Sequence, residues 1–120
     1  MNCLECKAVS LVRSDAVRGT RTILEQVDCR FEAAQVSLVT GDTGAGKSSL
    51  LHLLAGLLRP TSGEVFAGKD AVSRWVAGHR DRFRRDVGVS LQAPGLLPDL
   101  TVLENVILPL VPKCSRIAEA

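Results

Sequence analysis

With 120 residues the chain has the length of one domain, and a chain of this length can bury roughly two thirds of the surface that its unfolded form exposes. A composition of 46% hydrophobic and 23% charged residues is ordinary for a globular protein and argues against a disordered or fibrous chain. The net charge of +2 indicates no nucleic-acid partner, and no apolar run reaches the roughly 20 residues that cross a bilayer.

The first residues carry charge before an apolar run can form, so we expect neither a signal peptide nor a lipid-attachment signal, and the default compartment is the cytoplasm. Of the four cysteines, only Cys3 and Cys6 are close in sequence. Cys29 and Cys114 have no Cys or His nearby in the chain. We therefore expect free thiols and no disulfide or zinc site.

The first elements predicted in chain order are two strands. Apolar and polar residues alternate over residues 23–31, which is typical of a strand with one buried face. A turn is expected over residues 32–35. The short apolar, β-branched run at residues 36–39 then predicts a strand buried on both faces of a parallel sheet, which leads directly into a glycine-rich segment.

A helix is predicted after Gly46, because leucines recur at helical spacing as far as Leu58. Arg59 and Pro60 supply a stop, a short strand is expected over residues 64–67, and a helix near residues 73–85. The arginines of that second helix alternate with aspartates and lack an aromatic stacking series. They indicate a solvated helix face rather than a basic patch.

A third buried strand is predicted over residues 87–91, ending at Gln92, and prolines enforce a loop after it. Thr101 and Glu104 match a capping box, in which each side chain satisfies an otherwise unpaired amide at a helix start, so a helix is expected to run to Leu108. No repeat or linker is visible, which leaves one organised unit.

Residues 41–48 satisfy the Walker A pattern G-x-x-x-x-G-K-[ST], between an expected strand and an expected helix. Glycines let successive N–H groups point at phosphate oxygens, and the helix start adds the positive end of its dipole. Lys47 is expected to reach the β- and γ-phosphates, Ser48 to ligate a phosphate-bound Mg²⁺, and Ser49 to add a phosphate hydrogen bond. The predicted nucleotide-binding residues of this segment are Gly41, Asp42, Thr43, Gly44, Ala45, Gly46, Lys47, Ser48 and Ser49.

A glycine-rich turn before a helix is the alternative, but the four fixed positions arise by chance in a chain this long only about once in a few hundred. Walker A alone does not separate transport ATPases from kinases, GTPases or helicases. Residues 44–51, 60–65 and 87–92, in that order, resemble the ATP-binding family of ABC transporters. Residues 96–106 look like the segment after the family's Q-loop, especially in lipoprotein-release and macrolide-export ATPases.

The resemblance covers nearly the whole chain and implies what the chain is. Residues 1–120 would be the N-terminal part of a single ABC-type ATP-binding domain, with an α/β, P-loop NTPase-like core of mixed sheet and flanking helices, truncated before the helical subdomain is complete. The implied ligands are ATP and Mg²⁺. The implied partners are an integral-membrane permease and, for the full-length domain, a second copy. Such a subunit is cytoplasmic and peripheral at the inner face of the plasma membrane.

The resemblance also assigns single residues. Gln92 matches the family's Q-loop glutamine, which helps coordinate Mg²⁺ and position the attacking water, so Gln92 is the expected catalytic and second metal-binding residue. The segment after Gln92 would contact the permease. Where the family has an aromatic residue stacked on adenine, this chain has Arg13, whose planar guanidinium can stack on a base. Arg13 is therefore an expected nucleotide-binding residue.

Most of the family's hydrolytic residues have no match in these 120 residues. No carboxylate follows a four-residue apolar strand as a Walker B residue would, and the signature loop Leu-Ser-Gly-Gly-Gln is absent. Neither His52 nor His79 lies where the family's switch histidine belongs. We expect this stretch alone to be inactive in hydrolysis.

Three functions stay open from the sequence. The leading one is a fragment of the ATP-binding subunit of an ABC exporter, and the second is a P-loop module that binds nucleotide without turnover. The third is another P-loop enzyme, such as a kinase, or a soluble ABC protein acting in repair or translation. Because a parallel sheet needs both faces covered, we also expect exposed apolar surface and low stability in the isolated chain.

Overall fold

The computed structural model describes residues 3–93 and 95–108. The chain divides into two compact units, Met1–Val87 and Gly88–Ala120, which are described separately below. The first unit holds the strands β1 (Leu4–Asp15), β2 (Gly19–Phe31), β3 (Ser62–Ala67) and β4 (Asp70–Ala71) and the helices α1 (Lys47–Leu54), η1 (Val72–Arg74) and α2 (Ala77–Arg85). The second unit holds α3 (Val102–Ile107).

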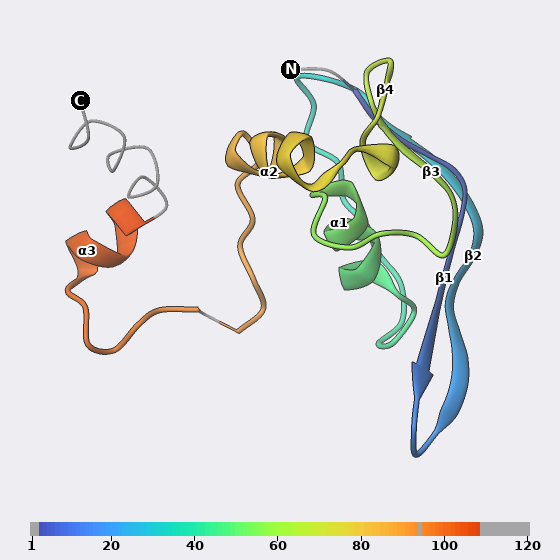
Figure 1. Ribbon diagram of the computed structural model, residues 1–120, viewed down its shortest axis with the longest axis horizontal. Helices are drawn as coiled ribbons and strands as arrows, with labels where there is room; N and C mark the ends of the chain where they lie inside the picture. The colour runs from blue at the N-terminus through green and yellow to red at the C-terminus, as the bar shows by residue number, and fades with distance from the viewer. Residues whose placement is uncertain (1–2, 94, 109–120) are drawn as a thin grey trace. The chain divides into compact units, whose positions relative to one another are not determined.

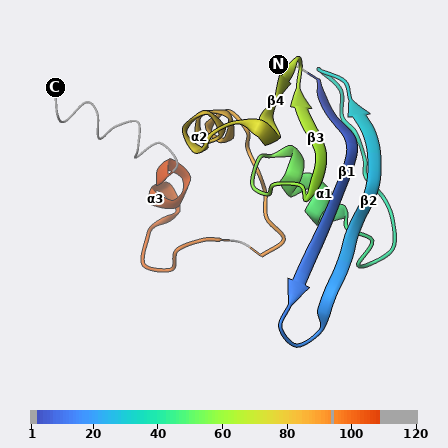
Figure 2. The same ribbon diagram turned by 45° about the vertical axis from the view of Figure 1, so that its right-hand side comes forward.

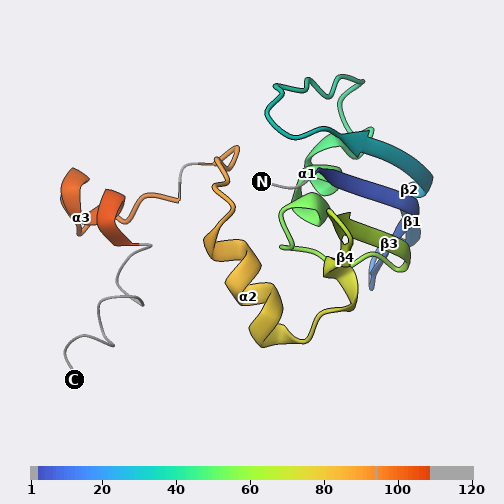
Figure 3. The ribbon, with the colours of Figure 1, turned by 90° about the horizontal axis from the view of Figure 1, so that it is seen from above.

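The strands form one antiparallel sheet in the order β2-β1-β3-β4 (Figures 1 and 3). β1 and β2 form a long hairpin, and β3 pairs with the other edge of β1. The predicted strands 23–31 and 64–67 are confirmed as parts of β2 and β3. The parallel arrangement predicted for the sheet is not found among the described residues, because every pairing there is antiparallel.

The β1–β2 hairpin bends at bulges that side chains stabilise. Ala8 and Gln26 have positive φ angles of 48° and 43°, and the register of the hairpin shifts around them. The Ala8 N–H donates to Asp28 Oδ1 at 2.8 Å, and the Gln26 N–H donates to Ser10 Oγ at 3.0 Å. Side-chain oxygens thus replace ladder partners that the bulges remove, which lets the strands curve.

The core lies between the sheet and α1, which packs on one sheet face (Figure 2). The strands contribute Cys6, Val9, Leu11, Leu24 and Val65, and α1 contributes Leu50, Leu53 and Leu54, all of them buried. Burial of one such aliphatic side chain stabilises a fold by about 1.5–3 kcal/mol. The helix predicted from the leucine spacing is confirmed, although α1 ends at Leu54 and not at Leu58, and Leu51 is 51% exposed.

The helical stretch predicted near residues 73–85 is confirmed in part. It consists of η1 and α2, separated by extended backbone at Trp75 and Val76. No residue of α2 is buried, as expected for a solvated face. One arginine is nevertheless used in packing, because Arg84 Nε donates to the Gly56 carbonyl at 2.7 Å and so ties α2 to the segment after α1.

The second unit confirms the predicted capping box. The Glu104 N–H donates to Thr101 Oγ1 at 3.2 Å, and the Thr101 N–H donates to Glu104 Oε2 at 2.7 Å. These bonds to Thr101 hold the pKa of the Glu104 carboxyl below its usual value. Asn105 Nδ2 donates to the carbonyls of Leu97, Leu100 and Thr101, which fastens the preceding loop to α3.

Two predicted strands are wrong. Residues 36–39 and 87–91 form no strand, and Gln92 therefore does not end one. Val36 is fully exposed, and the exposed fractions of Leu38 and Leu91 are 87% and 52%. An apolar run becomes a strand only where a neighbouring strand completes its hydrogen bonds, and within the described residues nothing pairs with either segment.

The described cysteines, Cys3, Cys6 and Cys29, are free thiols as predicted, while Cys114 lies outside the described residues. Cys29 does have a cysteine neighbour, because it stands opposite Cys6 in the β1–β2 register. Burial, together with the facing Cys29, raises the pKa of Cys6 to about 12. No group of metal-binding side chains occurs in the part of the chain that the structure describes, and none of its helices is long and apolar enough to cross a membrane.

Candidate functional site

The glycine-rich segment curls tightly before α1. The Ala45 N–H donates to the Asp42 carbonyl at 3.1 Å, which closes a turn, and the Leu50 N–H donates to the Gly46 carbonyl at 2.9 Å, which begins the helix. Gly44 and Gly46 have φ angles of 82° and 94°, in the left-handed region that glycine adopts without steric cost. Positive φ angles at alternate residues are a backbone feature of anion-binding nests, in which successive N–H groups point toward one side.

Close packing against β2 also requires glycine at position 46. A Cβ atom at this position would lie 2.8 Å from Leu24 Cδ2 and 3.0 Å from the Ile23 carbonyl oxygen. The start of α1 therefore rests directly against β2, with no space for a side chain between them. The core residue Leu24 thus fixes where the loop sits.

Lys47 spans the loop. Its Nζ donates to the carbonyl oxygens of Gly41 at 2.7 Å and Asp42 at 2.5 Å, so the ammonium ties the start of the loop to the start of the helix. These bonds satisfy N–H donors of the Lys47 ammonium, which forms no ion pair with a carboxylate of the described residues. The loop is therefore closed by the same side chain that the Walker A pattern assigns to phosphate.

A pocket of about 240 Å³ opens beside this loop. Its lining combines loop and helix-start residues with two residues of β2: Gly44, Gly46, Lys47, Ser48 and Ser49, together with Arg21 and Ile23. The structure thus brings the central Walker A residues around one hollow. Gly41, Asp42, Thr43 and Ala45 belong to the loop without lining the pocket wall.

Two sequence-predicted residues lie elsewhere. Arg13 does not line the pocket, although it stands opposite Arg21 in the β1–β2 register. Gln92 is exposed and belongs to the second unit. Arg21 and Ile23 line the pocket and were missed by sequence reasoning, because their place depends on the register of a hairpin and no Walker A residue is near them in sequence.

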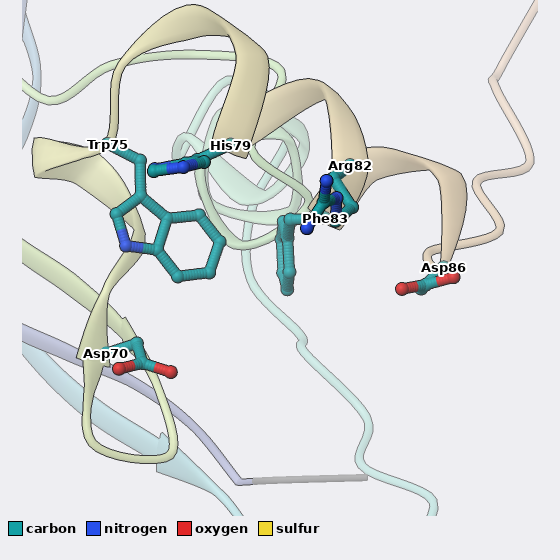
Figure 4. Close-up of a pocket in the computed structure, with 6 residues that line it drawn as sticks. All are labelled: Asp70, Trp75, His79, Arg82, Phe83 and Asp86. Carbon is teal, nitrogen blue, oxygen red and sulfur yellow. The ribbon is translucent and has the colours of Figure 1, made fainter.

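The described part of the chain also lines two hollows that are larger than the pocket beside the loop. One of about 340 Å³ lies between β4 and α2, where Trp75 meets His79 and Phe83 edge to face. Figure 4 shows Asp70 and Asp86 on either side of these rings. The other, of about 330 Å³, is in the second unit and is mostly apolar. Neither of these hollows is lined by a Walker A residue, so the volume of a hollow does not identify the phosphate site.

A glycine loop that packs on β2, a lysine at the first turn of the following helix and two serines beside one pocket are the features of a P-loop protein. A sequence model of the family described as ABC transporter matches residues 24–120. The chain therefore belongs to the ABC transporter family, as part of its ATP-binding domain. The resemblance seen in the sequence is confirmed.

Its relatives include lipoprotein-releasing system ATP-binding proteins called LolD. The protein from Syntrophotalea carbinolica is 44% identical over 104 residues, which are 83% of this chain and 46% of that protein. The protein from Idiomarina loihiensis is 36% identical over 107 residues, or 88% of this chain and 46% of that protein. The chain thus spans about half the length of these curated relatives.

The fold is similar to that of a solved ATP-binding cassette, MJ0796, in a dimeric post-hydrolysis state bound to ADP and Pi. The match has a TM-score of 0.84 and 30% sequence identity, and it covers 92% of this chain and 47% of that one. The expected mixed α/β architecture is therefore confirmed at this level, over about half of a cassette.

Proposed function

We propose that this chain binds the polyphosphate of ATP as part of the ATP-binding subunit of an ABC transporter. The observation that carries the proposal is the convergence of Gly44, Gly46, Lys47 and Ser48 on one pocket at the start of α1. Backbone N–H groups, a helix N-terminus and an ammonium together favour a bound anion. Family membership makes a nucleotide the ligand of choice.

Each residue has a role that its place supports. The Lys47 ammonium is close to the loop and would contact β- and γ-phosphate oxygens once it leaves the carbonyls that it now bonds. Ser48 lines the pocket, and its hydroxyl would hold a phosphate-bound Mg²⁺, while Ser49 adds a hydroxyl donor. Bound Mg²⁺ would neutralise phosphate charge. Gln92 is proposed as the second metal-binding residue through the family resemblance alone.

The permease contact is proposed for the segment after Gln92. In the second unit, Leu96, Val102 and Val106 are 69%, 82% and 68% exposed and line the apolar hollow beside α3. Exposed apolar patches of this kind are typical of protein–protein contacts. A permease on this surface would place the subunit at the inner face of the plasma membrane, with a second copy of the full-length domain as its other partner.

We assign the transporter to the lipoprotein-release or macrolide-export type. Several relatives carry the name lipoprotein-releasing system ATP-binding protein, and residues 96–106 resemble the segment after the Q-loop in ATPases of this type. No carboxylate of these 120 residues follows a four-residue apolar strand, so the activity proposed for this stretch is nucleotide binding. Gln92 alone is proposed to take part in turnover, through the family resemblance.

Titration of the purified 120-residue chain with MgATP tests the proposal. We expect saturable binding, followed by calorimetry, with MgADP and inorganic tripolyphosphate competing because the phosphate chain is the recognised part. Adenosine should not compete at the same concentrations. Absence of saturable binding by a folded chain, or equal competition by adenosine, would contradict the phosphate site. Co-purification of the full-length subunit with a permease would separate a transporter from a soluble P-loop enzyme.

Gln92→Ala should leave the affinity for MgATP within about twofold, because one neutral side chain at the edge of a metal site contributes little to binding of the phosphate chain. The same titration checks this, and Ala93→Gly, a neighbouring change without a functional group, is the control. A tenfold loss specific to Gln92→Ala would show that the Gln92 side chain contributes directly to ground-state binding of MgATP.

A further inference from the structure

The β2 side of the phosphate pocket carries a cation that no part of the Walker A pattern includes. Arg21 lines the pocket together with Ile23, two residues further along the same strand, and Ile23 lies against the start of α1 at Gly46. The β1–β2 register shifts between Leu11 and Val12, so the pairing passes over Ile23, which lies at a bulge of β2. Arg21 lies just before this bulge and borders the pocket from the β2 side.

Arg21 is also one of a pair of like charges. It stands directly opposite Arg13 in the β1–β2 register. Like charges in such cross-strand pairs are destabilising by up to about 1 kcal/mol. Neither guanidinium forms an ion pair with a carboxylate in the described ranges 3–93 and 95–108. The Arg21 guanidinium and the Lys47 ammonium thus both line one hollow, while Arg13 stands opposite Arg21 outside the lining. This charge arrangement favours an anion in the hollow.

We propose that Arg21 is a second cation of the phosphate site, binding the phosphate chain of the nucleotide from the β2 wall while Lys47 binds it from α1. This inference rests on the proposed function of the pocket. A guanidinium presents forked N–H donors that match phosphate oxygens, and such charge-assisted bonds are about twice as strong as neutral ones. Arg13 acts through Arg21, by adding positive potential at the pocket edge.

The experiment titrates variants of the 120-residue chain with MgATP and with inorganic tripolyphosphate by calorimetry. The variants are Arg21→Gln, Arg21→Lys, Arg18→Gln and Lys47→Ala. Arg21→Gln should raise the Kd of both ligands about tenfold, which is the lower end of the loss expected for a hydrogen bond to a charged group at an exposed site. Arg21→Lys should recover most of this loss. Arg18→Gln removes the same charge from the hairpin turn without lining the pocket, and it should change neither Kd by more than about twofold.

Salt supplies a further readout. If Arg21 contacts phosphate through its charge, the Kd of the wild-type chain should rise more steeply with salt concentration than that of Arg21→Gln. A role of Arg21 in holding the hairpin would instead lower the melting temperature and leave the salt dependence unchanged. Arg21 is exposed, so the fold should tolerate all of its replacements.

Two results would each overturn the assignment of Arg21 to the phosphate chain. Equal Kd values for Arg21→Gln and Arg18→Gln would overturn the assignment of Arg21. Weaker MgATP binding with unchanged tripolyphosphate binding would overturn it too, because Arg21 would then contact the base. Lys47→Ala is the reference for the site itself. If Lys47→Ala loses binding and Arg21→Gln does not, only the inference about Arg21 fails, whereas unchanged binding in Lys47→Ala refutes the site.

Discussion

Lys47→Ala should raise the Kd for MgATP by on the order of a hundredfold or more, beyond the range of an ordinary titration. The ammonium is expected to contact two phosphate groups, and each hydrogen bond to a charged group contributes about 1.5–3 kcal/mol, while every 1.4 kcal/mol is tenfold in Kd. The same change also removes the bonds from Nζ to the carbonyls of Gly41 and Asp42, which close the loop. Calorimetric titration measures the loss.

Two controls separate the charge from the shape of the loop. Lys47→Met keeps the length of the side chain without the ammonium and should lose as much affinity as Lys47→Ala. Lys69→Ala removes the same charge from an exposed turn between β3 and β4 and should leave the Kd unchanged. Melting temperatures should stay close to wild type, because the bonds of Lys47 are exposed. Undiminished MgATP binding in Lys47→Ala would refute the assignment of the loop.

The phosphate loop could be predicted from the sequence because its conformation is set locally. Glycines at positions 44 and 46 permit the left-handed turns, and the leucines that follow place α1 on the core. The capping box at Thr101 was predictable for the same reason, since both partners lie within one helical turn. Such features need no knowledge of distant parts of the chain.

The other pocket residues and the strand assignments depend on which segments pair with one another, and the sequence alone does not show that pairing. Arg21 enters the pocket only because β2 pairs with β1 in one register and Leu24 packs under Gly46. The strands predicted over residues 36–39 and 87–91 failed for the opposite reason. Their apolar pattern is that of a buried strand, but the hydrogen bonds and cover that a buried strand needs are not supplied within the described residues. A hydrophobic pattern shows which side chains of a segment could be buried, but it does not show which other segment covers them.

Gly63→Ala should destabilise the first unit by about 2–5 kcal/mol. Gly63 has a φ of 79°, and left-handed backbone costs a residue with a Cβ about 1–2 kcal/mol. The added Cβ would lie 2.1 Å from the Ala8 carbonyl oxygen and 2.6 Å from Val9 Cα, which forces β3 away from the bulge in β1. Overpacking of this kind costs a further 1–3 kcal/mol, roughly, and Val9 is wholly buried in the core beside it.

Denaturant unfolding followed by circular dichroism measures this loss against a matched change. Gly78 lies in α2 with a negative φ and open space at its Cβ position, so Gly78→Ala should leave stability unchanged or raise it by up to about 1 kcal/mol. Ala8→Gly should not rescue Gly63→Ala, because the obstacle is the carbonyl of residue 8 and not its methyl group. If Gly63→Ala is as stable as Gly78→Ala, then β1 and β3 do not approach each other at the bulge, and the sheet that supports the phosphate loop is paired differently.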